Sequence, residues 1–174
     1  FTPNVTGLSY FQIDDTTVDG TAVFNNMSGG VFDLNPPGST NHTIGVGTFN
    51  NAGIFNKNVN VSSSFGPAFN NQATGVVNVT SGTLTLGGTG TDVAGSTYNV
   101  PLGSTLNFGA SRTIAGSIAG AGSVGLYNSG GVVGIGISGS YNVSGATSVW
   151  ADCCGNTTIS FTGPVTNIGT TFTG

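Results

Sequence analysis

Apolar residues alternate with polar ones in short runs separated by glycine, and this pattern predicts β-strands. The segment GVVNVTSGTLTLGG, residues 75–88, shows the pattern most clearly. Val77, Val79, Leu84 and Leu86 occupy every second position on either side of a Ser-Gly turn. Because side chains alternate between the two faces of a strand, these four are expected to point inward while their polar neighbours face solvent.

The same strand–turn–strand form recurs along the chain. Residues 96–109 repeat it with a turn at 102–103, residues 139–150 with a turn at 144–145, and residues 157–172 in a looser copy. Helix is poorly supported, because Glu is absent and Lys, Arg and Met are scarce, whereas Gly, Thr, Ser, Asn and Val dominate. An all-β fold is therefore expected.

The copies are regularly spaced. Tyr-Asn-Val occurs at residues 98–100 and 141–143, which are 43 residues apart, and Phe49-Asn-Asn is followed by Phe69-Asn-Asn 20 residues later. A period of about 20 to 22 residues predicts a parallel β-helix, or β-solenoid, in which each repeat forms one coil. Phe-Asn-Asn then places an aromatic ring inside and turns the chain just afterwards, because Asn and Gly tolerate left-handed backbone. The alternative is an antiparallel β-sandwich, since Ser-Gly turns also close hairpins.

The solenoid repeat region is expected over residues 46–174, after an N-terminal cap or arm over residues 1–45. Residues 1–45 fit the repeat poorly and hold most of the acidic residues. It is expected either to cover the open edge of the first coil or to add a strand to a neighbouring molecule.

The low charge of the chain narrows the classes of function. Charged residues make up 5%, and Lys57 and Arg112 are its only bases. Nucleic-acid binding needs clustered Lys and Arg, so no nucleic-acid partner is expected. No run of eighteen apolar residues occurs, so no membrane span is expected either. The chain starts at Phe1 without a signal segment, which indicates a mature form or a fragment.

Several strings have a familiar form: GTFNNAGIFNK, GVVNVTSGTLTL, STYNVPLGSTLNF and IAGSIAGAGSV. They resemble the repeat regions of large bacterial surface proteins and autotransporter-like β-helix proteins. The resemblance covers about residues 45–174, and it implies a stalk or shaft that carries no catalytic residues. Residues 1–45 and the string WADCCGN have no counterpart in that pattern.

Asparagines in the acceptor pattern Asn-X-Ser/Thr are candidates for N-glycosylation. They are Asn4, Asn26, Asn41, Asn60, Asn78, Asn142 and Asn156. Roughly five matches arise by chance in this composition, so position is more informative than number. Asn60, Asn78 and Asn142 are expected to face outward, where a glycan would supply the solubility that charge does not. In a bacterial source they would instead be corner and ladder residues. Covalent N-glycans are the expected attached group, with O-linked sugars on the Thr- and Ser-rich strands as a further option, and no cofactor is expected.

Two further clusters are candidates for chemistry. Cys153 and Cys154 are adjacent, which leaves three interpretations open: a vicinal disulfide at a tight turn, two bonds to other chains, or two free thiols. Asp14, Asp15 and Asp19 lie near a glycine and form a weak calcium candidate. A solvated loop is the simpler interpretation of these three aspartates.

No catalytic site and no metal site are expected. Enzymes that cleave polysaccharides on a β-helix need convergent carboxylates or a basic residue poised as catalyst. The repeat region offers only Lys57, Asp92, Arg112 and Asp152, of which Asp92 and Arg112 are one coil apart and expected as an ion pair. A zinc site would need more ligands than two cysteines and the lone His42. Ice binding through rows of outward Thr is disfavoured, because Thr-X-Thr does not recur in each coil.

The aromatic residues Trp150, Tyr98, Tyr127 and Tyr141 are candidates for stacking on sugar rings, with packing in the core as the simpler interpretation. The prediction for function is a secreted or cell-surface structural protein, a glycosylated β-solenoid that assembles head to tail into fibrils. Open solenoid ends carry unpaired backbone groups, and the last residues, TTFTG, form a weak cap. The alternatives are an adhesin stalk segment of a larger cell-surface protein and a polysaccharide-binding β-helix module.

Overall fold

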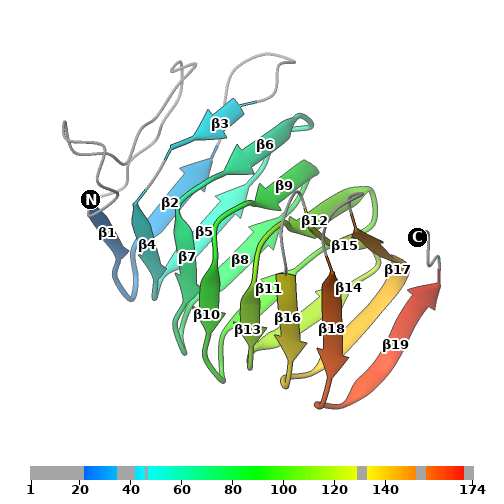
Figure 1. Ribbon diagram of the computed structural model, residues 1–174. Coiled ribbons are helices and arrows are strands. Elements are labelled where there is room, and N and C mark those ends of the chain that lie inside the picture. Colours follow the sequence, from blue (N-terminus) through cyan, green and yellow to red (C-terminus); the bar gives the residue numbers. More distant parts are fainter. Residues whose placement is uncertain (1–21, 35–41, 46, 129–132, 152–155, 171–174) are drawn as a thin grey trace.

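The chain folds as an all-β solenoid (Figure 1). The computed structural model describes residues 22–34, 42–45, 47–128, 133–151 and 156–170. Within these ranges there is no helix, and parallel strands stack in about six turns of roughly 22 residues. The predicted parallel β-helix is thereby confirmed, and the antiparallel sandwich is wrong. The described part of the chain also contains no helix of the length and hydrophobicity that a membrane crossing requires.

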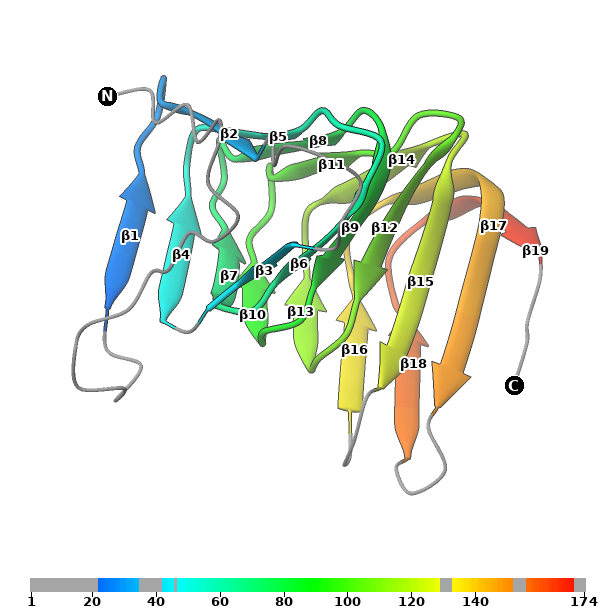
Figure 2. The same ribbon diagram turned by 90° about the horizontal axis from the view of Figure 1, so that it is seen from above.

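Each turn contributes strands to three faces of the solenoid, which Figure 2 shows from above. Face 1 contains β1 (Val23–Asn26), β4 (Thr48–Asn51), β7 (Ala68–Asn71), β10 (Gly90–Asp92), β13 (Arg112–Ile114), β16 (Val133–Ile137) and β18 (Thr157–Phe161). Face 2 contains β2 (Val31–Leu34), β5 (Ile54–Lys57), β8 (Val76–Val79), β11 (Thr97–Asn99), β14 (Ser117–Gly120), the first half of β17 (Tyr141–Ala151) and β19 (Val165–Thr170). Face 3 contains β3 (His42–Ile44), β6 (Ser62–Phe65), β9 (Gly82–Leu86), β12 (Ser104–Phe108), β15 (Ser123–Asn128) and the second half of β17.

Equivalent residues of successive turns lie above one another, so the core is built from columns of side chains. On face 1, Phe49 pairs in register with Phe69, and the two rings stack with centroids 5.5 Å apart and planes 5° from parallel. On face 2, Phe32 stacks on Phe55 at 5.2 Å. Phe49 meets Phe55 edge to face at 5.6 Å. Stacked rings within each face and edge contacts between faces are the arrangements that the ring quadrupole favours.

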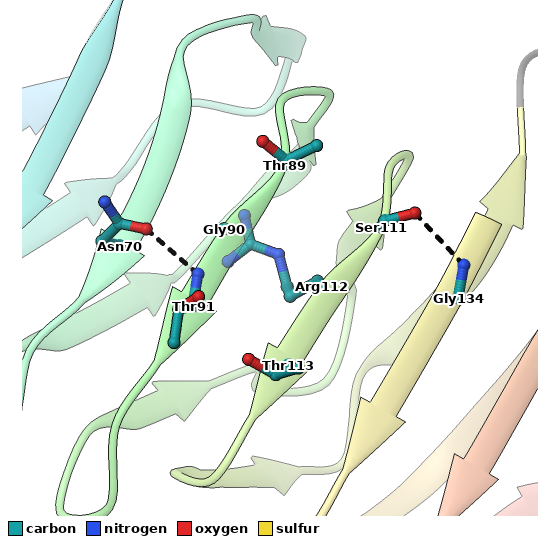
Figure 3. Close-up of a pocket in the computed structure, with 8 residues that line it drawn as sticks. All are labelled: Asn70, Thr89, Gly90, Thr91, Ser111, Arg112, Thr113 and Gly134. Carbon is teal, nitrogen blue, oxygen red and sulfur yellow. Dashed lines mark hydrogen bonds between the residues drawn. The ribbon is translucent and has the colours of Figure 1, made fainter.

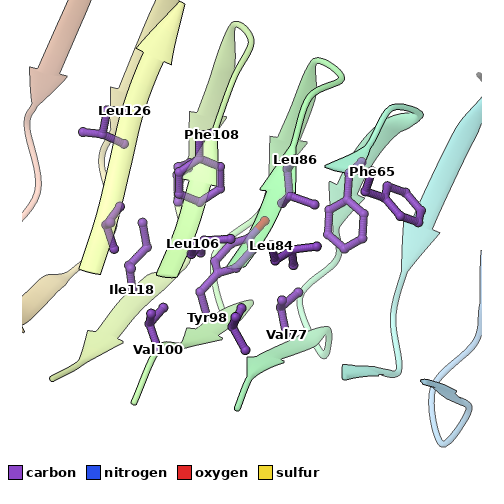
Figure 4. Packing of buried hydrophobic residues seen from close by; sticks show 14 of the residues in the cluster. Phe65, Val77, Leu84, Leu86, Tyr98, Val100, Leu106, Phe108, Ile118 and Leu126 are labelled. Carbon is purple, nitrogen blue, oxygen red and sulfur yellow. The ribbon is translucent and has the colours of Figure 1, made fainter. Parts of the chain in front are cut away.

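Farther along the solenoid the same interior is filled mainly by aliphatic side chains (Figure 4). Val77, Leu84, Leu86 and Leu106 are fully buried, as the alternation of apolar residues predicted for the first three. Each buried aliphatic side chain of this size contributes about 1.5–3 kcal/mol relative to an exposed one. Most of the stability therefore comes from stacking one turn on the next.

The solenoid begins earlier than the sequence indicated. Residues 23–34, inside the predicted cap or arm, form β1 and β2, which pair in register with β4 and β5. The signal was present, because Phe24-Asn25-Asn26 is another copy of the repeated triplet. The β1–β4 offset is 25 residues, from Val23 to Thr48, and this longer first turn hides the repeat. Residues 1–21 lie outside the described residues.

One predicted turn is present and one is wrong. At 102–103, Leu102 is 83% exposed and Gly103 has a φ of 83°, so the chain does turn there. At 144–145 the strand β17 instead continues, pairing with β14 on face 2 and with β15 on face 3. A Cβ on Gly145 would overlap the carbonyl oxygen of Gly122. This close approach holds the strand against the preceding turn through the corner.

Candidate functional site

Most of the charged side chains of the described turns lie inside the solenoid. Asp92 in β10 and Arg112 in β13 are buried on the inner side of face 1, with 2.9 Å between Arg112 Nη1 and Asp92 Oδ2. The ion pair expected from their spacing is confirmed. Lys57 is also buried, and Asp33 is half-buried. The outer surface of these turns is consequently almost free of charge.

Gly90 provides the space that the guanidinium of Arg112 occupies. The two residues pair in register, and a Cβ on Gly90 would lie 2.7 Å from Arg112 Nη2. Arg112 Nη1 also donates to the carbonyl oxygen of Phe69 at 3.1 Å, and Nη2 donates to that of Gly88 at 3.4 Å. The ring of Phe108 lies 5.3 Å from Arg112 Cζ. The Nε of Arg112 is buried without a hydrogen-bond partner among the described residues.

Tyr98 completes this buried cluster. Arg112 Nη1 lies 3.3 Å from the Tyr98 hydroxyl oxygen and donates to it. Burial raises the pKa of Tyr98 well above its usual value, and the charge of Asp92 acts in the same direction. Burial acts to lower the pKa of Arg112, but Tyr98 and Asp92 outweigh this effect and leave it raised. The cluster therefore holds a neutral phenol and a permanent ion pair.

The carboxylate of Asp92 also replaces part of the backbone ladder. The backbone N–H of Asn71 donates to Asp92 Oδ1 at 2.9 Å, and face 1 is divided between β7 and β10 at this point. A buried carboxylate is tolerated when a cation and N–H donors surround it. Asp92 has both, so the cluster is a structural junction between two segments of the sheet.

A shallow depression of about 350 Å³ lies over this junction on the outer side of face 1 (Figure 3). Its lining residues are Asn70, Thr89, Gly90, Thr91, Ser111, Arg112, Thr113 and Gly134. Asn70 Oδ1 accepts from the Thr91 N–H at 3.0 Å, and Ser111 Oγ accepts from the Gly134 N–H at 3.2 Å. The only charged group of this lining is Arg112, whose terminal nitrogens are engaged by Asp92 and by carbonyl oxygens. The described lining thus presents hydroxyls and amides, with no carboxylate or free base.

Lys57 lies at an inward position of face 2, in the column of Leu34 and Val79. Its Nζ donates to the carbonyl oxygens of Val59 and Ser81, the latter at 3.3 Å. Burial lowers the pKa of Lys57 to about 8. Strand alternation places Lys57 inward, two residues after Phe55, but the charge of a lysine suggested a surface position.

An inward column of asparagines on face 1 explains the repeated triplet with its following glycine. Asn26 Nδ2 donates to Asn51 Oδ1 at 2.8 Å, and Asn51 Nδ2 donates to Asn71 Oδ1 at 2.9 Å. Each amide also donates to a carbonyl oxygen at the start of a neighbouring face 2 strand, as Asn26 does to Ile54 at 3.0 Å. Glycine must follow, because a Cβ on Gly75 would overlap Asn71 Oδ1. The triplet asparagines were expected mainly at corners, with ladder positions as the alternative for the acceptor asparagines, and the inward direction of this ladder was not predicted.

Two further asparagine ladders run along the outside. On face 1, Asn50 donates to Asn25 and Asn70 donates to Asn50, both at 2.9 Å. On face 2, the links are Asn56 to Asp33, Asn78 to Asn56 and Asn99 to Asn78, each 2.8 Å. Amide ladders of this kind repeat at the spacing of the turns and add to the stability of stacked strands.

The structure separates the predicted glycosylation candidates by exposure. Asn60, Asn142 and Asn156 are exposed, as expected for the first two. Asn78 faces outward but is half-buried in the face 2 ladder. Asn26 is buried, and its side-chain Nδ2 donates hydrogen bonds to Asn51 Oδ1 and to the carbonyl oxygen of Ile54. A folded chain can therefore present Asn60, Asn142 and Asn156 to a modifying enzyme far better than Asn26.

The remaining predicted candidates lie outside the described residues. They are Asn4, Asn41, Asp14, Asp15, Asp19, Asp152, Cys153 and Cys154. His42 belongs to β3, and the position of its side chain is not described. Within the described ranges, no group of three or more His, Cys, Asp or Glu residues is placed to hold a metal ion.

The aromatic candidates divide into two pairs. Tyr98 and Tyr141 are fully buried, which confirms core packing for both. The Tyr141 hydroxyl lies 2.6 Å from Thr147 Oγ1, and burial raises the pKa of Tyr141 to about 12. Tyr127 and Trp150 are neighbours on the outer side of face 3, with ring centroids 6.0 Å apart.

The fold and these side-chain columns can be set beside known proteins. Comparisons of the chain with protein-family models, with curated proteins and with solved structures found no match.

Proposed function

We propose that this chain is a structural protein, an extracellular β-solenoid rod that associates end to end into a fibre. The observation that carries the proposal is the placement of polar groups. Lys57, Asp92 and Arg112 are withdrawn into the core, while amide ladders run along two outer faces. These features stabilise a long, regular, uncharged surface, which suits a rod better than a reaction centre.

Solubility of such a surface needs an explanation other than charge. Among the described residues, Asp33 is the only charged side chain that is not buried. The exposed acceptor sequences at Asn60, Asn142 and Asn156 would carry glycans that project from the rod. Glycosylation of these three sites and an extracellular location are parts of the same proposal.

The last described turn offers a surface for end-to-end association. β18 and β19 pair with β16 and β17, and with no further strand among the described residues. Asn167 continues the outward column of Asn142, and Ile168 continues the inward column of Val143. Strand β2 of a second copy, with its alternating outward and inward side chains, would extend both columns. Unpaired strand edges favour such addition.

A pair of lysine substitutions in β19 tests the association. Ile168→Lys places an ammonium group at an inward position of the open edge, where a second copy would bury it. Asn167→Lys adds the same charge one residue earlier on the outside. We expect Ile168→Lys to abolish filaments in electron micrographs and in sedimentation, and Asn167→Lys to leave them largely intact.

The outcomes separate the proposal from its main alternative. Filaments in the wild-type chain that persist in Ile168→Lys would rule out association through this edge. A wild-type chain that stays monomeric at all concentrations would reject the fibre and favour a stalk segment of a larger surface protein.

A further inference from the structure

We propose that the outer side of face 3 binds a neutral polysaccharide chain along a strip formed by Gly87, Gly109, Tyr127 and Trp150. These residues occupy equivalent positions in successive turns, one residue beyond the inward Leu86, Phe108, Leu126 and Val149. The site goes beyond the proposed fibre, because end-to-end association uses strand edges, whereas the strip lies on the outward side of face 3.

The aromatic end of the strip is directed to solvent. Tyr127 and Trp150 pair in register and alternate with the inward Leu126 and Val149. Trp150 is 49% exposed, and the planes of the two rings are inclined by 57°. Trp150 is exposed and Tyr127 is half-buried, so the pair offers one open aromatic face and one partly open one on the outside of a regular sheet. Adjacent aromatic rings at a surface are suited to binding.

At the other end of the strip, the positions that precede Tyr127 in successive turns are the glycines Gly87 and Gly109, which carry no side chain. A Cβ on Gly109 would lie 3.5 Å from Tyr127 Cε2 and 3.6 Å from Gly87 Cα, so the three residues are contiguous. A Cβ on Gly87 would meet its nearest atoms at 3.7 and 3.8 Å. Neither glycine has a left-handed φ. Both positions would accept a side chain without strain, so backbone geometry does not demand glycine. Gly87 is exposed and leaves the surface open there, whereas Gly109 is buried beside the Tyr127 ring.

A column of uncharged polar groups borders the strip. Ser64, Thr85, Asn107 and Ser148 point outward from neighbouring turns of face 3, with Gly125 between the last two. Asn107 Nδ2 donates to Thr85 Oγ1 at 3.4 Å, and the four polar residues of the column are all partly exposed. The strands of face 3 contain no Asp, Glu, Lys or Arg.

These groups match the chemistry of a neutral sugar chain. A pyranose ring has a C–H face that meets the negative face of an aromatic ring, and a rim of hydroxyls that both donate and accept hydrogen bonds. An anionic ligand would find no cation on these strands. A strip that crosses four successive turns and is open at the glycine end suits an extended chain better than a compact ligand.

Trp150 is the only tryptophan of the chain, so its fluorescence reports on the site directly. The probes are cellohexaose, a linear mannohexaose and, as an acidic control, hexagalacturonate. We expect a saturable blue shift with at least one neutral hexasaccharide, insensitive to salt, and no shift with the acidic one. The shift should be absent when protein is concentrated without sugar.

Substitutions locate the binding. Tyr127→Ala should weaken the affinity roughly tenfold, and Gly87→Trp should weaken it similarly by covering the open surface there. In affinity electrophoresis through a gel that contains a neutral glucan, the Trp150→Ala variant should no longer be retarded by the glucan. The control is Leu102→Ala, which removes the most exposed apolar side chain at a turn away from the strip and should bind normally.

Three results would overturn the proposal. The first is no saturable shift and no gel retardation with any neutral glycan. The second is equal retardation of Trp150→Ala and Leu102→Ala. The third is a shift that depends on protein concentration alone, which would assign the strip to a second copy of the chain. The first two results leave the proposed fibre untouched, because the fibre is tested separately by Ile168→Lys and Asn167→Lys.

Discussion

The two halves of the solenoid use one backbone coil and fill it with different side chains. In β1, β4 and β7 the inward positions of face 1 hold a column of phenylalanines beside a column of asparagines. In β13, β16 and β18 the first column continues with Arg112 and then two isoleucines. The second column continues with Ile114, Ile137 and Phe161. The coil itself therefore does not require a polar or an apolar interior at this corner.

The junction at β10 shows what such a change requires. The side-chain amide of Asn71 ends the ladder with both groups engaged, because Oδ1 accepts from Asn51 and Nδ2 donates to the Thr97 carbonyl oxygen at 3.2 Å. The backbone N–H of Asn71 still needs a buried acceptor at this point.

Asp92 follows Asn71 in the asparagine column and accepts its backbone N–H. Arg112 neutralises Asp92 and fills the space above Gly90. The ion pair ends the polar column so that Ile114 can begin the apolar one.

Breaking the junction should have the largest effect on stability. Arg112→Met leaves the carboxylate of Asp92 buried without its cation, and we expect a loss of about 3–5 kcal/mol in the free energy of unfolding. Urea denaturation followed by circular dichroism measures it.

The double variant Asp92→Asn/Arg112→Met provides the control. It continues the amide column without a buried charge and should lose clearly less than Arg112→Met alone. A double variant that is less stable than the single one would contradict the role assigned to the ion pair.

The asparagine columns of the first half allow a comparison between adjacent residues. Asn51→Ala leaves Asn26 Nδ2 and Asn71 Oδ1 without their partner inside the core, and should cost about 2–3 kcal/mol. Asn50→Ala removes a link of the outer ladder, where water replaces it, and should cost less than about 1 kcal/mol. Equal urea midpoints for the two variants would show that the inner ladder has no special weight.

The buried lysine of the first half predicts a dependence on pH. The folded chain releases the Lys57 proton near pH 8, whereas the unfolded chain holds it to about 10.5. The unfolded state binds more protons in this window, so the free energy of unfolding should rise as the pH increases through it. Above pH 10, Tyr141 acts in the opposite sense, because its folded pKa is raised from 10.0 to about 12.

Lys57→Met tests this prediction. The variant should be at least as stable as wild type at pH 7 and should lose the rise between pH 8 and 10, as measured by urea midpoints. Parallel pH profiles of variant and wild type would show that the pKa of Lys57 is not lowered.

The last prediction, with the smallest expected effect, concerns how fully the acceptor asparagines carry glycans in the two halves of the solenoid. Asn142 lies beyond Ala119, which interrupts the face 2 ladder, whereas Asn78 donates to Asn56 and accepts from Asn99. After expression in a eukaryotic secretory host, peptide mass spectrometry should find Asn142, Asn60 and Asn156 occupied more fully than Asn78, and Asn26 least. Predominant occupancy at Asn26 in the folded, secreted protein would contradict the burial described for it.

Much of the fold could be read from local patterns. Alternation identified Val77, Val79, Leu84 and Leu86 as core residues, and the spacing of Phe49 and Phe69 identified the stack of turns. The hydrogen-bond partners of individual polar residues could not be predicted from local patterns. Alternation places Asn51 and Lys57 inward after Phe49 and Phe55, but it does not show which partners satisfy their polar groups, and only the columns above and below them do.

The repeat in the sequence favoured a parallel solenoid over an antiparallel sandwich, because short alternating strands that recur every 20 to 22 residues can bury their apolar side chains by stacking turns. The tertiary structure decided which side chains meet between turns, since the register of each turn on the next depends on corner lengths that vary along the chain. That register places Gly90 beside Arg112, continues Asn71 with Asp92, and brings Tyr127 next to Trp150. The ion-pair junction and the proposed sugar-binding strip both arise from contacts between residues about one turn apart.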